Sequence, residues 1–141
     1  MNSLELEKKV KQIVHSLAYE KGFVCSVDVL LKLTYLSKQD HESWRFGRID
    51  YLEKVCQVNL GKLSLINQTL RKNANELKLE RSWTGYHKFG KGVSKKLIFS
   101  KSRDSKIEDA YATHYVDKKR IDELKKIKAG ANHDPVKDGE V

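Results

Sequence analysis

Cysteine, proline and long apolar runs are scarce in this sequence. Its 141 residues include two cysteines, Cys25 and Cys56, and a single proline. Two isolated cysteines exclude a disulfide-rich scaffold, and their spacing does not match a zinc site. Because both have apolar neighbours, we expect two reduced, buried thiols. A disulfide between them is the less favoured alternative. No apolar run approaches the roughly 18–20 residues that span a bilayer, and the amphipathic N-terminus carries acids, unlike a signal or transit peptide. These features predict a cytoplasmic protein.

The sequence also lacks the patterns that carry chemistry. No glycine-rich loop precedes a helix with a Lys-Ser or Lys-Thr pair, which excludes a cradle for a nucleoside triphosphate. The neighbouring acids Glu108 and Asp109 fall at an expected helix start, where acidic side chains are favoured without any metal. We therefore expect no catalytic residues, no cofactor and no metal.

Positive charge is what the sequence has in excess, and it is concentrated. The formal net charge is +9. Residues 41–103 carry a net charge of +9, whereas residues 1–40 carry +1 and residues 104–141 carry −1. A cationic excess that the two ends do not share is typical of a surface that binds a polyanion. The alternative is a well-solvated basic surface that serves only solubility.

Several segments show apolar residues at three- and four-residue steps, which predicts amphipathic helices. Ser26, Ser37 and Asn59 precede three of these segments and are residues that favour helix N-caps. In the longest segment, Leu65 is the one apolar residue on the polar face. The predicted helices cover residues 4–20, 27–36, 38–46, 49–56 and 60–77.

Residues 81–103 contain seven basic residues and no acid. The two halves of this segment, 83–89 and 95–100, are rich in aromatic and β-branched residues, and a glycine-containing loop separates them. This pattern predicts a two-stranded hairpin. We expect Trp83, Tyr86 and Phe99 to hold the two strands together rather than to stack on bases, because aromatic residues in hairpins usually pair across strands.

The last part of the chain predicts two more helices and a tail. Ser105 and Glu108 form a capping-box pattern that opens a helix carrying Tyr111, His114 and Tyr115 on one face. Residues 117–128 continue as a helix, and 129–141 have the composition of a disordered tail. We thus expect one globular domain over 1–128, including C-terminal helices over 104–128. The thin apolar stripes of the first and last helices allow a homodimer.

The order of short helix, turn, long helix and hairpin is that of a winged helix-turn-helix. We therefore expect a mostly α fold with one β-hairpin, of α+β class, with a winged-helix-like core over about 23–103. The long helix would enter the major groove and the basic hairpin would follow the phosphates. The predicted partner is nucleic acid, duplex DNA more than RNA, and not a membrane. The expected contact residues are Ser64, Gln68, Arg71, Lys72, Arg81, Lys88, Lys91, Lys95, Lys96, Lys101 and Arg103.

Two other functions stay open. Many winged-helix domains bind proteins instead of DNA, and Leu65 would then contact the partner. A small nuclease is the third hypothesis: His87 and His114 could act as base and acid if the helix at 105–115 packed on the hairpin, with Lys88 or Arg103 stabilising the phosphorane. The simpler interpretation of His114 is a hydrogen-bonded side chain at the edge of the core.

The stretches SWTGYHKFGKG…LIFSKSRDSKIEDAYATHYV and YLSKQDHESWRFGRIDYLEKV also resemble a group of small bacterial proteins without a known activity. The resemblance covers roughly residues 23–116. It implies a bacterial, cytoplasmic protein and transfers no catalytic or binding residue.

Overall fold

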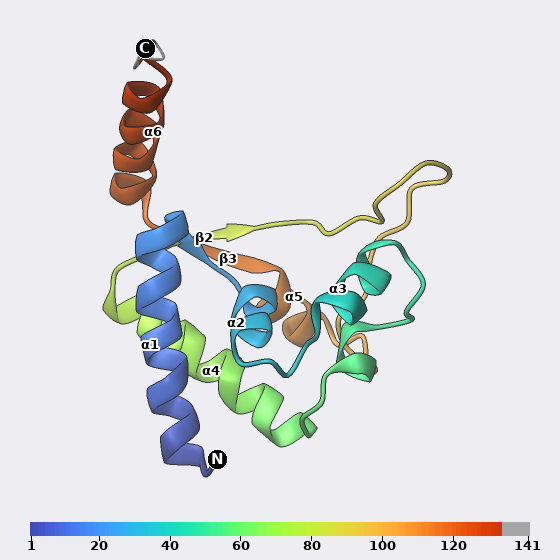
Figure 1. Cartoon of the computed structure of the whole chain (residues 1–141). Coiled ribbons are helices and arrows are strands. Elements are labelled where there is room, and N and C mark those ends of the chain that lie inside the picture. Colours follow the sequence, from blue (N-terminus) through green and yellow to red (C-terminus); the bar gives the residue numbers. More distant parts are fainter. Residues whose placement is uncertain (134–141) are drawn as a thin grey trace.

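The computed structural model describes residues 1–133, which form six α-helices and a small three-stranded antiparallel sheet (Figure 1). The fold is therefore mostly helical and of α+β class, as expected. The elements are α1 (Ser3–Lys21), β1 (Phe23–Val24), α2 (Ser26–Lys32), α3 (Lys38–Arg45), the 3-10 turn η1 (Leu52–Val55), α4 (Leu60–Glu76), β2 (Glu80–Trp83), α5 (Ser105–Ala112), β3 (Thr113–Val116) and α6 (Lys118–His133).

The helices α1, α3 and α4 form where the apolar periodicity and the caps predict them. Asn2 and Glu5 make a reciprocal capping box at the start of α1. The side chains of Ser37 and Asn59 accept backbone N–H bonds from Asp40 and Lys62, which satisfies orphan donors at the starts of α3 and α4. The core stripe of α4 packs against α1, and its members Leu63, Ile66, Leu70 and Ala74 are buried.

Other helix predictions are wrong in detail. The helix expected at 27–36 is α2, which ends at Lys32, and Ser26 is not its cap: its buried hydroxyl instead donates to Oδ1 of Asn67 on α4. The helix expected at 49–56 is only the 3-10 turn η1. Asp104, rather than Ser105, caps α5, since its carboxylate accepts from the N–H groups of Lys106 and Ile107.

The sheet replaces the expected hairpin. Its strand order is β1-β3-β2, so the last strand of the sequence lies between the other two. Within β2, Arg81 pairs with Tyr115 and Ser82 with His114, both in β3. His114 and Tyr115 therefore belong to a strand and not to the helix predicted for them. The backbone of the hairpin partner expected for residues 83–89 pairs with that segment through the isolated bridge of His87 and Lys96, and the two form no strand pair.

The segment between β2 and α5, residues 84–104, is here called the basic loop. Its base is docked on the core, because Tyr86, Leu97 and Phe99 are buried. The rings of Tyr86 and Phe99 meet edge to face at 5.1 Å, as expected for these two residues, whereas Trp83 is exposed and pairs with Thr113 of β3. The fully buried Trp44 of α3 donates its indole N–H to the carbonyl oxygen of Ile98 at 2.8 Å. The tip of the loop projects away from the body (Figure 1).

The chain leaves the sheet through α6, which contacts α1 and extends away from the body (Figure 1). This helix continues to His133, so residues 129–133, expected in a disordered tail, are helical. Residues 134–141, the rest of that predicted tail, lie outside the described residues. Over residues 1–133, no helix combines the length and apolarity needed to span a membrane.

Candidate nucleic-acid interface

The exposed face of α4 carries the hydrogen-bonding side chains that the sequence points to. Ser64 and Gln68 lie one turn apart and both are exposed. The side-chain amide of Gln68 donates to the hydroxyl of Ser64 at 3.1 Å. Arg71 and Lys72 follow on the same helix and are exposed as well. By contrast, Leu65 is half-buried and packs against the core of this chain.

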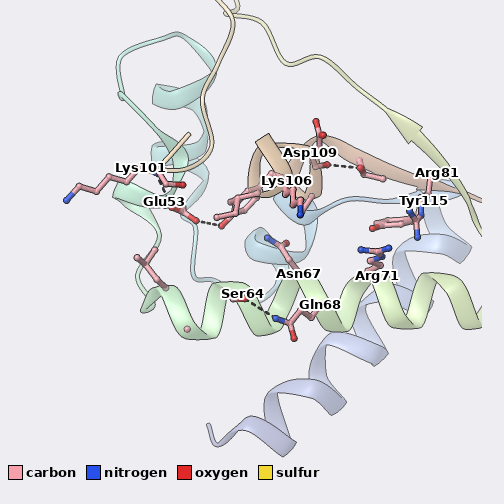
Figure 2. Close-up of a pocket in the computed structure, with 17 residues that line it drawn as sticks. Glu53, Ser64, Asn67, Gln68, Arg71, Arg81, Lys101, Lys106, Asp109 and Tyr115 are labelled. Atoms are coloured by element: carbon pink, nitrogen blue, oxygen red, sulfur yellow. Dashed lines mark hydrogen bonds between the residues drawn. The ribbon is translucent and has the colours of Figure 1, made fainter. Parts of the chain in front are cut away.

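This face of α4 forms the floor of an open groove of about 1170 Å³, here called the α4–α5 groove. Helix α5 forms the facing wall, and strands β2 and β3 close one end (Figure 2). Five of the predicted contact residues line it, namely Ser64, Gln68, Arg71, Arg81 and Lys101. Its other lining residues are Glu53, Leu60, Gly61, Asn67, Ser102, Lys106, Ile107, Asp109, Ala110, Tyr111, Thr113 and Tyr115.

A second, shallower hollow is formed by α4 alone. It brings Lys72 together with Gln68, Arg71, Asn75 and Glu76. Six of the predicted residues are thus gathered along one helix and the groove beside it.

The remaining predicted residues lie on the basic loop and not in the groove. Lys91, Lys95 and Lys96 are exposed, and the Lys96 ammonium lies 5.8 Å from the centroid of the exposed Trp83 ring. Lys88 is half-buried, since its aliphatic stem lies against Gly47. Arg103 is exposed on the turn before α5 with a left-handed φ of 58°.

These basic side chains have no carboxylate partner within the chain described by the structure. Its four ion pairs join Lys21 to Asp28, Lys54 to Asp50, Lys118 to Glu80 and Arg120 to Glu123. None of them uses one of the nine bases among the predicted contact residues. Their charges are therefore available to an anion from outside the chain.

One end of the groove is strongly cationic. Arg71 of α4 and Arg81 of β2 lie on either side of Tyr115 (Figure 2). Burial raises the pKa of the Tyr115 hydroxyl, and the charges of Arg81 and Arg71 act against that rise. Both guanidinium groups are thus close enough to act on one hydroxyl.

The other end of the groove is organised around an acid. Glu53 of η1 accepts a hydrogen bond from the Tyr111 hydroxyl at 2.8 Å and another from the N–H of Lys101 at 3.2 Å. Burial is the main cause that raises the pKa of the Tyr111 hydroxyl, and the hydrogen bond to Glu53 is the second. The hydroxyl therefore keeps its proton and remains a donor.

Most residues that line this groove were not predicted from the sequence. Asn67 carried no prediction, and Tyr111 and Tyr115 were expected only to share one face of a helix. Lys106 is the one missed residue with a local signal, because it is a base in the first turn of a helix that follows a basic segment. Helices α5 and α4 face each other because of the path that the basic loop takes between β2 and α5. No local sequence pattern predicts that path.

The two histidines of the nuclease hypothesis have different surroundings. Nε2 of His114 is hydrogen-bonded to the Tyr86 hydroxyl at 2.8 Å, and its ring stacks on Phe23 with centroids 5.3 Å apart. Burial lowers the pKa of His114, which favours the neutral imidazole. His87 is exposed and forms the bridge to Lys96. The hydrogen-bonded, core-edge interpretation of His114 therefore accounts for its contacts.

The two cysteines are not joined in a disulfide, and their surroundings do not favour a reactive thiolate. Both are free and buried, as predicted, and burial raises the pKa of Cys25 to about 11 and that of Cys56 to about 12. Such thiols stay protonated near neutral pH and are poor nucleophiles. Within the described part of the chain, no three histidine, cysteine or acidic side chains are grouped to hold a metal ion.

The chain matches no protein-family model, no curated protein and no solved structure at a significant level, so its function has to be inferred from its own residues.

Proposed function

We propose that this protein binds nucleic acid, with duplex DNA as the preferred form, through α4 and the basic loop of a winged-helix fold. The observation that carries the proposal is the set of nine bases on α4, β2 and the basic loop, none of which is paired with a carboxylate in residues 1–133. Unpaired cations on one part of a chain attract polyphosphates, and their binding releases counterions that were condensed on the nucleic acid.

The order of the elements supports the winged-helix part of the proposal. A winged helix runs helix, strand, helix, helix, strand, loop, strand, and its last strand lies in the middle of the sheet. The sequence α1, β1, α2, α4, β2, basic loop, β3 and the strand order β1-β3-β2 follow that plan. The additions are α3 with η1 before α4, and α5 at the end of the basic loop. In this plan α4 is the recognition helix and the basic loop is the wing.

The exposed residues of α4 suit contact with base edges. A major groove about 12 Å wide admits one helix, and amide and hydroxyl groups read base edges there. Gln68, Lys72 and Asn75 line the hollow that α4 forms alone, so a duplex reaches them without displacing α5. Lys91, Lys95 and Lys96 are exposed on the basic loop, and in this proposal they contact the phosphate backbone. The two free thiols fit a reducing cytoplasm, which we propose as the location.

The test is a fluorescence-anisotropy titration with duplex DNA, single-stranded DNA and RNA at several salt concentrations. If about five phosphates are neutralised, the logarithm of the binding constant should fall against the logarithm of salt with a slope near −4.5. Lys95→Glu combined with Lys96→Glu should weaken binding to every sequence alike by at least about tenfold. Gln68→Ala should instead change which sequence is preferred.

The matched control reverses two neighbouring lysines that are equally exposed but lie on α6, Lys125→Glu with Lys126→Glu. It changes the net charge by the same amount, so a larger loss in the Lys95 and Lys96 variant identifies a local contact. A salt-independent titration, or equal losses in the two double variants, would refute the proposal. Strand cleavage that His87→Ala or His114→Ala abolishes would replace it with the nuclease hypothesis.

A further inference from the structure

The α4–α5 groove combines an apolar stretch with a cationic end. Leu60 lies at the start of α4, and Ile107 and Ala110 line the groove from α5. Arg71 is eleven residues further along α4 than Leu60, which is about 16 Å at 1.5 Å per residue. The groove is slightly larger than the roughly 300–1,000 Å³ of most small-molecule sites, which are mostly apolar with a few converging polar groups.

The cationic end has no anionic partner within the described part of the chain. Arg71 and Arg81 approach the same tyrosine from two elements, and neither has a carboxylate partner among residues 1–133. Two guanidinium groups held close together repel one another, and an oxyanion between them removes that repulsion and accepts charge-assisted hydrogen bonds.

Tyr115 is an independent sign of a ligand. Only 4% of this residue is exposed, yet it lines the groove. In the described chain, the one side-chain polar atom that is sealed from solvent without a hydrogen-bond partner is Asn73 Nδ2. The Tyr115 hydroxyl is therefore not sealed, and it opens into the groove that the residue lines. A hydroxyl that faces the groove between two guanidinium groups can donate to the same oxyanion that they bind.

The two acids that line the groove do not occupy this end. Glu53 is held by Tyr111 and by the N–H of Lys101 at the other end. Asp109 lies on α5, and its side chain points away from α4 (Figure 2). Neither forms an ion pair with Arg71 or Arg81.

We propose that the α4–α5 groove binds a small amphipathic organic anion. Its carboxylate, phosphate or sulfonate head is held by Arg71, Arg81 and the Tyr115 hydroxyl, and its apolar body lies along Leu60, Ile107 and Ala110. This site does not depend on the proposed nucleic-acid function, because it requires no contact from the lysines of the basic loop.

The test compares two fluorescent probes that share an apolar body. Anilinonaphthalene sulfonate (ANS) carries the anionic head, and N-phenylnaphthylamine is its uncharged counterpart. In the absence of nucleic acid, ANS should bind saturably at one site per chain, at least about tenfold more tightly than the neutral probe. Tenfold corresponds to about 1.4 kcal/mol, which is the lower end of one hydrogen bond to a charged group.

Variants locate the probe. Arg71→Gln and Arg81→Gln should each weaken ANS binding at least about tenfold, and Tyr115→Phe about threefold or more. Arg48→Gln removes an exposed guanidinium far from the groove lining and is the matched control, which should bind ANS like the wild type. Thermal unfolding of each variant checks that the fold is kept.

The inference is overturned if the neutral probe binds as tightly as ANS, or if the Arg71 and Arg81 variants bind ANS as the control does. Lys95→Glu with Lys96→Glu separates the two proposals. It should abolish most nucleic-acid binding and leave ANS binding unchanged, so either function can fail while the other holds.

Discussion

Glu108 shows how one side chain joins two segments that the sequence treats as unrelated. Its carboxylate accepts hydrogen bonds from the backbone N–H of Phe99 at 3.0 Å, the N–H of Ser100 at 2.7 Å and the Ser100 hydroxyl at 2.6 Å. The capping-box pattern predicted that Glu108 would turn back onto the start of α5. Instead, Asp104 caps that helix, and Glu108 is left to anchor the returning arm of the basic loop.

Glu108→Ala should destabilise the protein by about 2–3 kcal/mol. The change leaves the two backbone N–H groups and a hydroxyl without their charged acceptor, and each bond to a charged group contributes roughly 1.5–3 kcal/mol before water replaces part of it. Urea unfolding followed by circular dichroism measures the change.

Asp109→Ala is the matched control, because Asp109 is the next acid on α5 and is exposed. Its effect should stay within about 0.5 kcal/mol. Equal effects of the two substitutions would show that the Glu108 bonds do not anchor the loop.

At the scale of elements, the helices were largely predictable from the sequence and the sheet was not. The ends of α1, α3 and α4 follow from Asn2, Ser37 and Asn59 and from apolar periodicity, which act within a few residues. The partner of β2 is β3, some thirty residues away, and the apparent hairpin strand at 95–100 instead packs Leu97 and Phe99 into the core. Local patterns cannot distinguish these two pairings, because both segments are aromatic and β-branched.

The same limit applies to the candidate site. Ser64, Gln68 and Arg71 were predictable from the polar face of one helix. Tyr111 and Tyr115 were predicted only to share one face of a helix; both are buried and both line the groove. That role depends on how α5 and β3 are placed over α4, which is a property of the tertiary fold.

Gly22 sets the junction of α1, β1 and α6. It ends α1 in the left-handed region with a φ of 78°, and a Cβ on this residue would lie 2.5 Å from Cγ1 of Ile121 in α6. Gly22→Ala should therefore destabilise the protein by about 2–3 kcal/mol, from backbone strain and from the clash together. The free energy of urea unfolding is the measurement.

Gly130→Ala is the control at this scale. Gly130 lies in α6 with no atom within 4 Å of a Cβ built on it, so alanine should be neutral or stabilise by up to about 1 kcal/mol. If Gly22→Ala and Gly130→Ala lowered the free energy of unfolding equally, the effect of Gly22→Ala could not be assigned to the junction between α1 and α6.

At the scale of the whole molecule, exposed apolar residues lie in more than one region. Leu60 and Ile107 line the groove beside its unpaired bases, whereas Leu4, Tyr19 and Ile127 lie on α1 and α6. Arg120 of α6 donates to the carbonyl oxygen of Tyr19 and lies 4.0 Å from its ring centroid, which fixes α6 on α1. A homodimer through these helices stays a prediction, and it would leave α4 and the basic loop free.

The two proposed sites share Arg71, so their ligands should compete. Coupling between two ligands is reciprocal, and an anion that occupies the guanidinium of Arg71 removes it from a phosphate. Saturating ANS should weaken duplex binding at least about tenfold, and duplex should displace ANS to the same degree.

Ala110→Trp separates competition from a general effect of the probe. Ala110 lines the groove from α5 but lies outside the hollow that α4 forms alone. A tryptophan there occupies the apolar stretch beside Ile107 where the body of ANS would lie. This variant should lose ANS binding, keep its duplex affinity within about twofold and show no response of duplex binding to ANS. Fluorescence and anisotropy titrations on one sample follow both ligands. Simultaneous binding of ANS and duplex to the wild type at unchanged affinities would mean that Arg71 does not serve both sites.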